Sequence, residues 1–191
     1  MIPLLSTAYL PPISYVNECV SSGKIILEQH EHYVKQTYRN RANIYGANGM
    51  LPLIIPVQHE KLFEIPVKDV KISYSSQWQK IHWRSITSAY RNSPYFEFFE
   101  DEFAPFYAQK FETLFEFNLE LMKRIFSLMK IKVEIFFTSA YEKDIESVKD
   151  LRNYFSPEKR DPQETYRQVF AERTGFISDL SIADKLFNQL T

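Results

Sequence analysis

The sequence predicts an α/β fold: a single domain over residues 1–191, with a mostly parallel or mixed sheet, helices and a long central helix. Three observations predict it. The length of 191 residues suits one ordinary domain. Residues 1–29 alternate strand, helix and strand, as at the start of a βαβ unit. Aromatic residues make up 16% of the chain, enough for a large core of rings.

The first elements follow from short apolar runs and turn residues. Residues 2–5 are apolar and predict a buried strand. Residues 11–20 predict a helix, because two prolines suit its first turn and apolar residues then recur at helical spacing until Gly23. Residues 24–29 predict a second strand, parallel to the first because a helix connects the two.

The next stretch has neither a helical nor a strand pattern, and we name it the connecting segment (residues 30–41). Within residues 44–49, an Asn-Gly pair predicts a hairpin turn. Apolar and β-branched runs predict strands over residues 50–57 and 67–73, the second at a sheet edge.

Helical spacing is clearest in the middle of the chain. Trp78, His82 and Ala89 fall on one face of a helix predicted over residues 78–89. Residues 101–129 predict the longest helix, with an apolar side; roughly 25 helical residues at 1.5 Å each would span about 38 Å.

The C-terminal third predicts shorter elements. Residues 132–138 predict a strand and residues 144–155 a helix. Residues 156–165 contain two prolines and mixed charges, which favours a loop or hinge. Residues 166–170 predict a strand and residues 181–190 a final helix.

The composition excludes several function classes. With 23 Lys and Arg against 24 Asp and Glu, the chain has no overall basic field, so we expect no nucleic-acid partner. The positions of its 4 glycines do not form a glycine-rich nucleotide-binding motif. The single Cys19 excludes an internal disulfide or a cysteine-based metal cluster. We therefore expect no cofactor.

No window approaches 18 consecutive apolar residues, so we expect no membrane insertion. The first positive charge is Lys24, and Pro3, Pro11 and Pro12 interrupt the apolar residues before it. An export signal has a basic start and an unbroken apolar stretch, so the cytoplasm is the expected location.

The connecting segment is the sharpest local signal of a ligand. A guanidinium binds phosphate or carboxylate, amides bind hydroxyls, and rings pack on sugar faces. The segment supplies all of these as His30, Lys35, Gln36, Tyr38, Asn40 and Arg41. The alternative is an exposed hairpin whose charges only contact water. Ser6 and Thr7 end the first predicted strand, where ligands collect in open α/β sheets.

Histidines suggest two further chemistries. His30 and His32 point to the same side of an extended segment, and His59 could add a third imidazole for a zinc or iron site. His82 is either a core histidine or a general base or acid. Cys19 has no nearby base in sequence, which favours inert packing over a nucleophile.

Short motifs run in order along nearly the whole chain: Tyr9-Leu10-Pro11 through Tyr15, Lys35-Gln36, Tyr38, Asn40-Arg41, Trp78, His82, Tyr90, Pro94-Tyr95-Phe96, Tyr166, Gln168-Val169-Phe170, Gly175-Phe176 and Leu180-Ser181-Ile182. In these motifs the chain resembles the WbqC-like family of bacterial proteins. The chain departs from the family pattern in two places. Residues 5–8 are Leu-Ser-Thr-Ala where relatives often have His-Gln-Pro-Asn, and Tyr38 replaces a usual Trp.

The resemblance implies a role in bacterial surface-polysaccharide (O-antigen) synthesis, with an acyl or aminoacyl group transferred to a sugar nucleotide. We expect a nucleotide sugar or another anionic small molecule as substrate. Its ligand-binding residues would be Tyr9, Lys35, Gln36, Tyr38, Asn40, Arg41 and Trp78, with His30 or His82 as the catalytic residue. The alternatives are a non-catalytic module that binds a ligand or partner and a metal-dependent hydrolase that uses His30 and His32.

Overall fold

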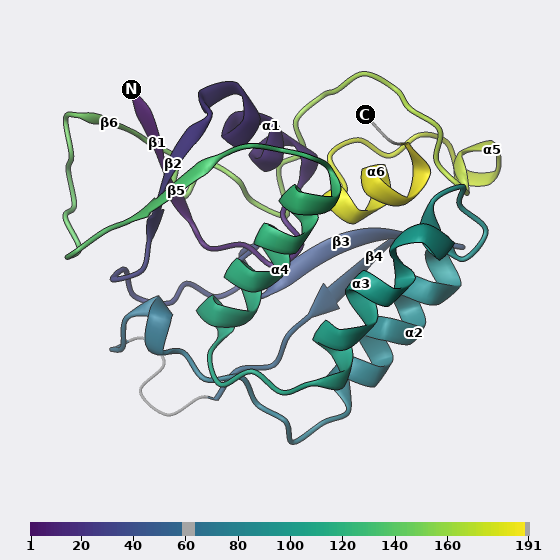
Figure 1. Ribbon diagram of the computed structural model, residues 1–191, viewed down its shortest axis with the longest axis horizontal. Coiled ribbons are helices and arrows are strands. Elements are labelled where there is room, and N and C mark those ends of the chain that lie inside the picture. The colour runs from purple at the N-terminus through teal and green to yellow at the C-terminus, as the bar shows by residue number, and fades with distance from the viewer. Residues whose placement is uncertain (59–63, 190–191) are drawn as a thin grey trace.

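A four-stranded parallel sheet forms one half of the molecule (Figure 1). The computed structural model describes residues 1–58 and 64–189. The strand order is β5-β2-β1-β6, and each neighbouring pair is parallel. The strand bounds are β1 (Ile2–Ser6), β2 (Lys24–Glu28), β5 (Glu134–Phe137) and β6 (Val148–Asp150). The predicted α/β class is confirmed.

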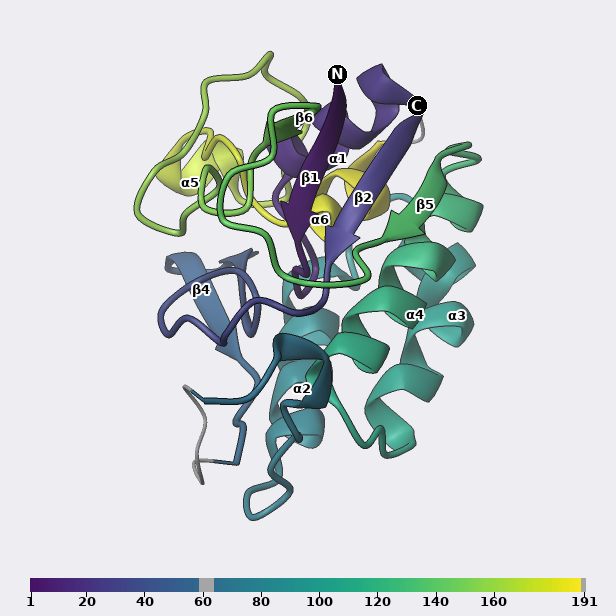
Figure 2. The same ribbon diagram turned by 90° about the vertical axis from the view of Figure 1, so that its left-hand side faces the viewer.

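The predicted βαβ opening is confirmed. Helix α1 (Ile13–Ser22) connects β1 to β2, and Leu4 of β1 lies opposite Ile26 of β2 in the parallel register. Gly23 ends the helix with φ of 65°, a left-handed conformation that glycine adopts without a steric penalty. Figure 2 shows β1, β2 and β5 running side by side with their carboxyl ends in the same direction.

A separate antiparallel hairpin follows the connecting segment. Its strands are β3 (Arg41–Gly46) and β4 (Gly49–Ile54), with Arg41 opposite Ile54. The predicted turn is confirmed but narrower than residues 44–49, because β3 extends to Gly46. The strand predicted over residues 50–57 ends at Ile54, and Val57 forms only an isolated bridge with Ile72.

Helices form the other half of the molecule. α2 (Trp78–Tyr90), α3 (Phe96–Ala108) and α4 (Leu114–Leu128) lie beside one another (Figures 1 and 2), and α6 (Ile182–Asn188) packs against α2, α3 and β3. Phe117 of α4 is fully buried at the centre of this layer. The rings within 6.3 Å of its centroid are Tyr9, Trp78, Phe106, Tyr107 and Phe111. The helices predicted over residues 78–89 and 181–190 are confirmed over the described residues.

The long central helix predicted over residues 101–129 is wrong, because two shorter helices stand in its place. α3 ends at Ala108, and the side chain of Thr113 accepts a hydrogen bond from the backbone N–H of Glu116 at 3.2 Å, which caps the start of α4. The residues between the helices hydrogen-bond to another segment instead, as Ile72 N donates to Glu112 O at 3.1 Å. α4 is 15 residues long, about 22 Å.

Three smaller predictions are also wrong. Residues 144–155 contain strand β6 rather than a helix, because residues 148–150 find hydrogen-bond partners along β1. Residues 67–73 contain a short 3-10 helix, η1 (Val67–Asp69), and two isolated bridges. Residues 166–170 form no strand, since the side chains of Tyr166 and Gln168 anchor that stretch to Asp184.

The remaining expectations concern the loop and the membrane. Residues 156–165 carry neither helix nor strand, as expected of a loop, apart from a bridge between Ser156 and Lys159. A four-residue helix, α5 (Ala171–Thr174), follows. In the described part of the chain, no helix has the length and apolar character needed to cross a bilayer.

Candidate functional site

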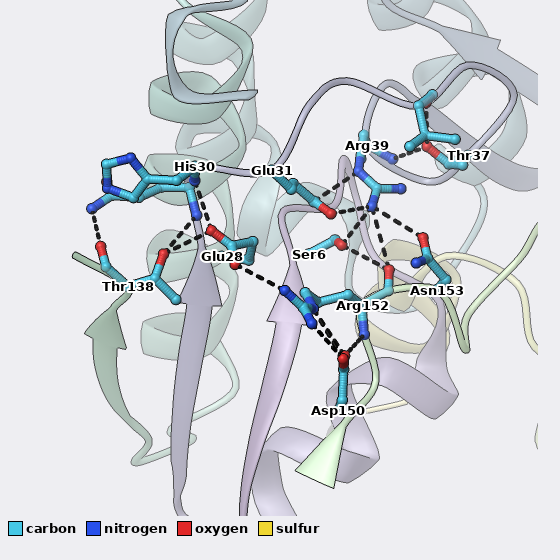
Figure 3. A network of polar contacts seen from close by, with 12 residues as sticks. Ser6, Glu28, His30, Glu31, Thr37, Arg39, Thr138, Asp150, Arg152 and Asn153 are labelled. Atoms are coloured by element: carbon cyan, nitrogen blue, oxygen red, sulfur yellow. Dashed lines mark hydrogen bonds and ion pairs between the residues drawn. The ribbon is translucent and has the colours of Figure 1, made fainter. Parts of the chain in front are cut away.

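Polar and charged side chains gather at the carboxyl ends of the parallel strands (Figure 3). Ser6 ends β1, Glu28 ends β2 and Asp150 ends β6. Parallel strands of one sheet end at the same edge, and ligands of open α/β sheets bind outside that edge. The candidate site therefore begins at these three residues.

Arg39 of the connecting segment is buried above this edge. Its Nε donates to Glu31 Oε1 at 2.9 Å and its Nη2 to Glu31 Oε2 at 2.7 Å, a bidentate pair. The same Nη2 donates to Ser6 Oγ at 2.7 Å and lies 3.4 Å from Asn153 Oδ1. A guanidinium that is 2% exposed is tolerated here because carboxylate, hydroxyl and amide oxygens surround it.

Arg152 is the second buried guanidinium at the strand ends. Its Nη2 donates to Asp150 Oδ2 at 2.6 Å, its Nη1 lies 3.2 Å from Glu28 Oε2, and the carbonyls of Glu142 and Lys143 accept two further bonds. The hydrogen bonds from Arg152 lower the pKa of Asp150. Because β2, β6 and the loop after β5 all contribute to these bonds, the bonds join three strand ends. We name the two arginines and their partners Glu28, Glu31 and Asp150 the ion network.

Glu28 is fully buried at the centre of this edge. Its Oε1 accepts from the backbone N–H of His30 at 2.7 Å and from Thr138 Oγ1 at 2.8 Å. The residues Ser6 and Thr7, expected beside a ligand, instead line a cavity of only about 10 Å³, room for about one water. The two arginines occupy the place that the sequence analysis left for a ligand.

A larger cavity opens beside this network, and we name it the strand-end cavity. Its volume is about 280 Å³, and the residues that line it are His30, Glu31, His32, Val34, Tyr141 and Asn153. They come from the loops that follow β2, β5 and β6, which is the position expected for a ligand in a parallel sheet.

Other residues of the connecting segment line a second cavity, which we name the hairpin cavity. Its volume is about 330 Å³, and its lining residues are Tyr33, Lys35, Gln36, Asn40, Arg41, Ile54, Ile55, Pro56 and Val57. Four of the predicted ligand-binding residues thus surround one hollow, with an apolar wall from the end of β4. His30 lies in the other cavity.

Two side-chain atoms of residues that line the hairpin cavity, Asn40 Oδ1 and Arg41 Nε, are buried and lack a partner within the described residues. The amide of Asn40 cannot be flipped, because its Nδ2 donates to Ile55 O at 2.8 Å and an oxygen there would face an oxygen. Asn40 is 7% exposed, so its free oxygen is a buried acceptor. A buried polar atom without a partner is costly unless a ligand or water meets it.

The cavity also holds a strained residue and a buried phenol. Gln36 has φ of 60°, a left-handed conformation that costs a residue with a side chain about 1–3 kcal/mol and is found most often at functional sites. Burial raises the pKa of Tyr33 to about 12, although the nearby charge of Arg41 lowers it. Tyr33 is therefore a neutral hydrogen-bonding group at ordinary pH.

The other predicted site residues lie in the core. Tyr9 OH lies 3.0 Å from His82 Nδ1 and 2.9 Å from Tyr107 OH, and Trp78 packs on His82. Burial lowers the pKa of His82 to about 4, opposed by a hydrogen bond with the backbone of Ile54. His82 is thus placed as a neutral core histidine.

Tyr38, Tyr9 and Trp78 line neither the strand-end cavity nor the hairpin cavity. Tyr38 is 4% exposed and lines only the water-sized hollow beside Ser6. Cys19 is fully buried in α1, and burial raises the pKa of its thiol, so inert packing describes it better than a nucleophilic role.

The comparison with known families supports the resemblance found in the sequence. A profile of the WbqC-like protein family matches residues 7–159. The chain belongs to this family. No curated protein and no solved structure matches this WbqC-like chain. The matched range contains both cavities and the ion network, so they lie in the part of the chain that defines the family.

The metal-site hypothesis finds no support in the described residues, which contain no group of three or more His, Cys, Asp or Glu arranged to hold a metal ion. Glu31, which sits between the two candidate histidines, gives both carboxylate oxygens to Arg39. His59 lies outside the described residues.

Sequence reasoning missed the ion network of this WbqC-like chain. Glu28, Arg39 and Arg152 were not chosen as site residues, although each is at least nine-tenths buried. The available signal was the position of Glu28 at the end of an otherwise apolar strand, since a carboxylate there requires a cation.

Proposed function

We propose that the protein is a cytoplasmic enzyme that binds a sugar nucleotide or a phosphorylated sugar in the hairpin cavity and transfers an acyl or aminoacyl group to an amino-sugar, in bacterial surface-polysaccharide synthesis. The single observation that carries the proposal is the lining of the hairpin cavity by Lys35, Gln36, Asn40 and Arg41, with a buried acceptor and a buried donor left without partners.

The charges of this cavity suit an anionic ligand. Lys35 and Arg41 supply two cations to one hollow, and its described lining contains no Asp or Glu. Arg41 would donate to a phosphate oxygen, and Asn40 would bond to a sugar hydroxyl. Gln36 supplies a second amide, and the apolar wall formed by residues 54–57 would cover the carbon side of the sugar.

Proton transfer is assigned to His30 rather than to His82. His30 is partly exposed at the strand-end cavity, whereas His82 is 4% exposed and bonded to Tyr9. The acceptor amine or hydroxyl would then react at the strand-end side of the connecting segment, and the anionic group would be held on its other side.

A second candidate is a non-catalytic module that binds the same anionic ligand. One observation favours it: among the described residues of the hairpin cavity there is no histidine, carboxylate or thiol, and Tyr33 is neutral. In that case the ligand would be bound and not turned over.

Calorimetric titration and thermal unfolding test the binding proposal. A ligand present at 100 times its Kd adds about 2.7 kcal/mol of stability. At about 2–4 °C per kcal/mol for a chain of this size, Tm rises by roughly 5–11 °C. We expect a nucleotide sugar or a sugar phosphate to give this shift. Arg41→Gln should abolish it, and the matched exposed variant Arg124→Gln should keep it.

If no anionic sugar shifts Tm, or if Arg41→Gln shifts as much as the wild type, the binding proposal is wrong. Turnover is tested separately by the mass of the sugar after incubation with acyl-CoA or aminoacyl donors. An unchanged sugar mass with ligand binding intact selects the non-catalytic module.

A further inference from the structure

We propose that the strand-end cavity is a separate binding site for a neutral sugar ring. The inference names the ligand class of the cavity at which the proposed function places His30, but it does not depend on the cations of the hairpin cavity. It rests on the position of the cavity at the strand ends, on the hydrogen bonds that hold its lining, on the charge around it and on the kind of side chain that lines it.

The floor of the cavity is held rigidly. Glu31, which lines the wall, is held by two hydrogen bonds from Arg39, and Asn153 Oδ1 lies 3.4 Å from the same guanidinium. The guanidinium carbon of Arg152 lies 5.1 Å from the ring centroid of Tyr141. Two lining residues, Glu31 and Asn153, are therefore held by Arg39 of the ion network (Figure 3), as a pre-formed binding site requires.

The charge of this region favours a neutral ligand over a phosphate. No Lys or Arg is among the described residues that line the cavity, and the two arginines nearby are engaged with oxygens. The network contains three carboxylates, Glu28, Glu31 and Asp150, against two guanidiniums. An anion would meet an excess of negative charge without a free cation, so a neutral ligand fits better.

The lining supplies what a sugar ring needs. His30, His32 and Asn153 each have donor and acceptor atoms, as sugar hydroxyls do. Tyr141 is 53% exposed and Val34 is 44% exposed, so an aromatic face and an apolar side chain are available for the C–H face of a pyranose. The volume of about 280 Å³ is near the lower end for ligand pockets, which fits one ring.

Nuclear magnetic resonance of the histidine side chains tests the proposal directly, with full-length protein at one fixed pH. The probes are methyl β-glucopyranoside and N-acetylglucosamine as neutral sugars, adenosine as a neutral aromatic ring, and inorganic phosphate. We expect the neutral sugars to shift the imidazole signals of His30 and His32 with a Kd in the millimolar range. The buried His82, away from this cavity, should not shift.

Variants connect the signal to the cavity. Tyr141→Ala should weaken sugar binding by at least about tenfold, equivalent to 1.4 kcal/mol, whereas Tyr141→Phe should retain it because the ring remains. Tyr154→Ala is the matched control, because Tyr154 is 46% exposed but lies outside the cavity lining.

Three results would overturn the inference: no sugar shifts the two histidines, adenosine shifts them and sugars do not, or Tyr141→Ala binds as the wild type does. The two proposals fail in different experiments. Phosphate binding and its loss in Arg41→Gln test the hairpin cavity of the proposed function. Neutral-sugar binding and its loss in Tyr141→Ala test the strand-end cavity.

Discussion

Replacing Arg39 by methionine should destabilise the protein strongly. Methionine keeps a long apolar stem but removes the guanidinium. Glu31, whose side chain is 7% exposed, would then hold a charge without its partner, and Ser6 Oγ would lose its donor at 2.7 Å. Removing one partner of a buried ion pair costs about 3–5 kcal/mol. At about 2–4 °C per kcal/mol, Tm falls by roughly 6–20 °C.

Urea unfolding followed by circular dichroism measures this loss, with an unchanged m value as the sign that only stability has changed. Arg124→Met is the matched control. Its partner Glu102 lies 3.1 Å away and both side chains are nearly half exposed, so the expected loss is about 0–1 kcal/mol. The double variant Arg39→Met/Glu31→Leu should recover most of the loss, because no unpaired charge remains. A loss below about 1 kcal/mol for Arg39→Met would refute the reasoning.

Two further predictions concern pH and have opposite signs. Burial raises the pKa of Asp184 from 3.8 to about 6, so its contribution to stability is present below pH 3.8 and is lost as the pH rises through 6. Burial lowers the pKa of His82 from 6.5 to about 4, so its contribution is present above pH 6.5 and is lost as the pH falls through 4. Each shift is worth about 3 kcal/mol, so the two nearly cancel between pH 4 and pH 6.5 in the wild type. On acidification, Asp184→Asn should therefore lose stability faster than the wild type, and His82→Asn should gain stability relative to the wild type. Urea unfolding at each pH measures both changes. Parallel pH profiles for the wild type and both variants would contradict this.

The sequence was sufficient where local patterns agree with the tertiary structure. Apolar runs and a glycine stop predicted the βαβ opening, and the face shared by Trp78 and His82 predicted α2. It was insufficient where distant partners decide. The amphipathic stretch 144–155 becomes partly a strand because β1 offers it an edge, and helical periodicity cannot reveal that edge.

The break between α3 and α4 had a local signal that was overlooked. Thr113 and Glu116 have the Thr-x-x-Glu spacing of a helix start, and the structure uses Thr113 as the cap. The apolar spacing of residues 101–129 continues across the break, because both helices bury rings in the same core. Periodicity alone therefore predicted one helix.

The candidate site was predictable in part. The mixture of cations and amides pointed to Lys35, Gln36, Asn40 and Arg41, which do line one cavity, while their role in binding stays a prediction. The sequence could not show that His30 faces a different cavity, since the segment has no regular period.

The buried ion pairs of the ion network could not be predicted from short-range sequence patterns. Arg39 and Glu31 are separated by eight positions, and Arg152 meets Glu28 across 124 positions. Such pairs depend on which strand ends the fold brings together, and no spacing in one sequence encodes that.

The position of the two tryptophans limits what intrinsic fluorescence can report about this molecule. Trp78 and Trp83 both belong to α2, one against Phe117 and the other against Tyr107, and neither lines the hairpin cavity or the strand-end cavity. Intrinsic fluorescence will therefore report unfolding of the helical half and change little when a small molecule binds in either cavity. A silent titration by that method carries no information about occupancy.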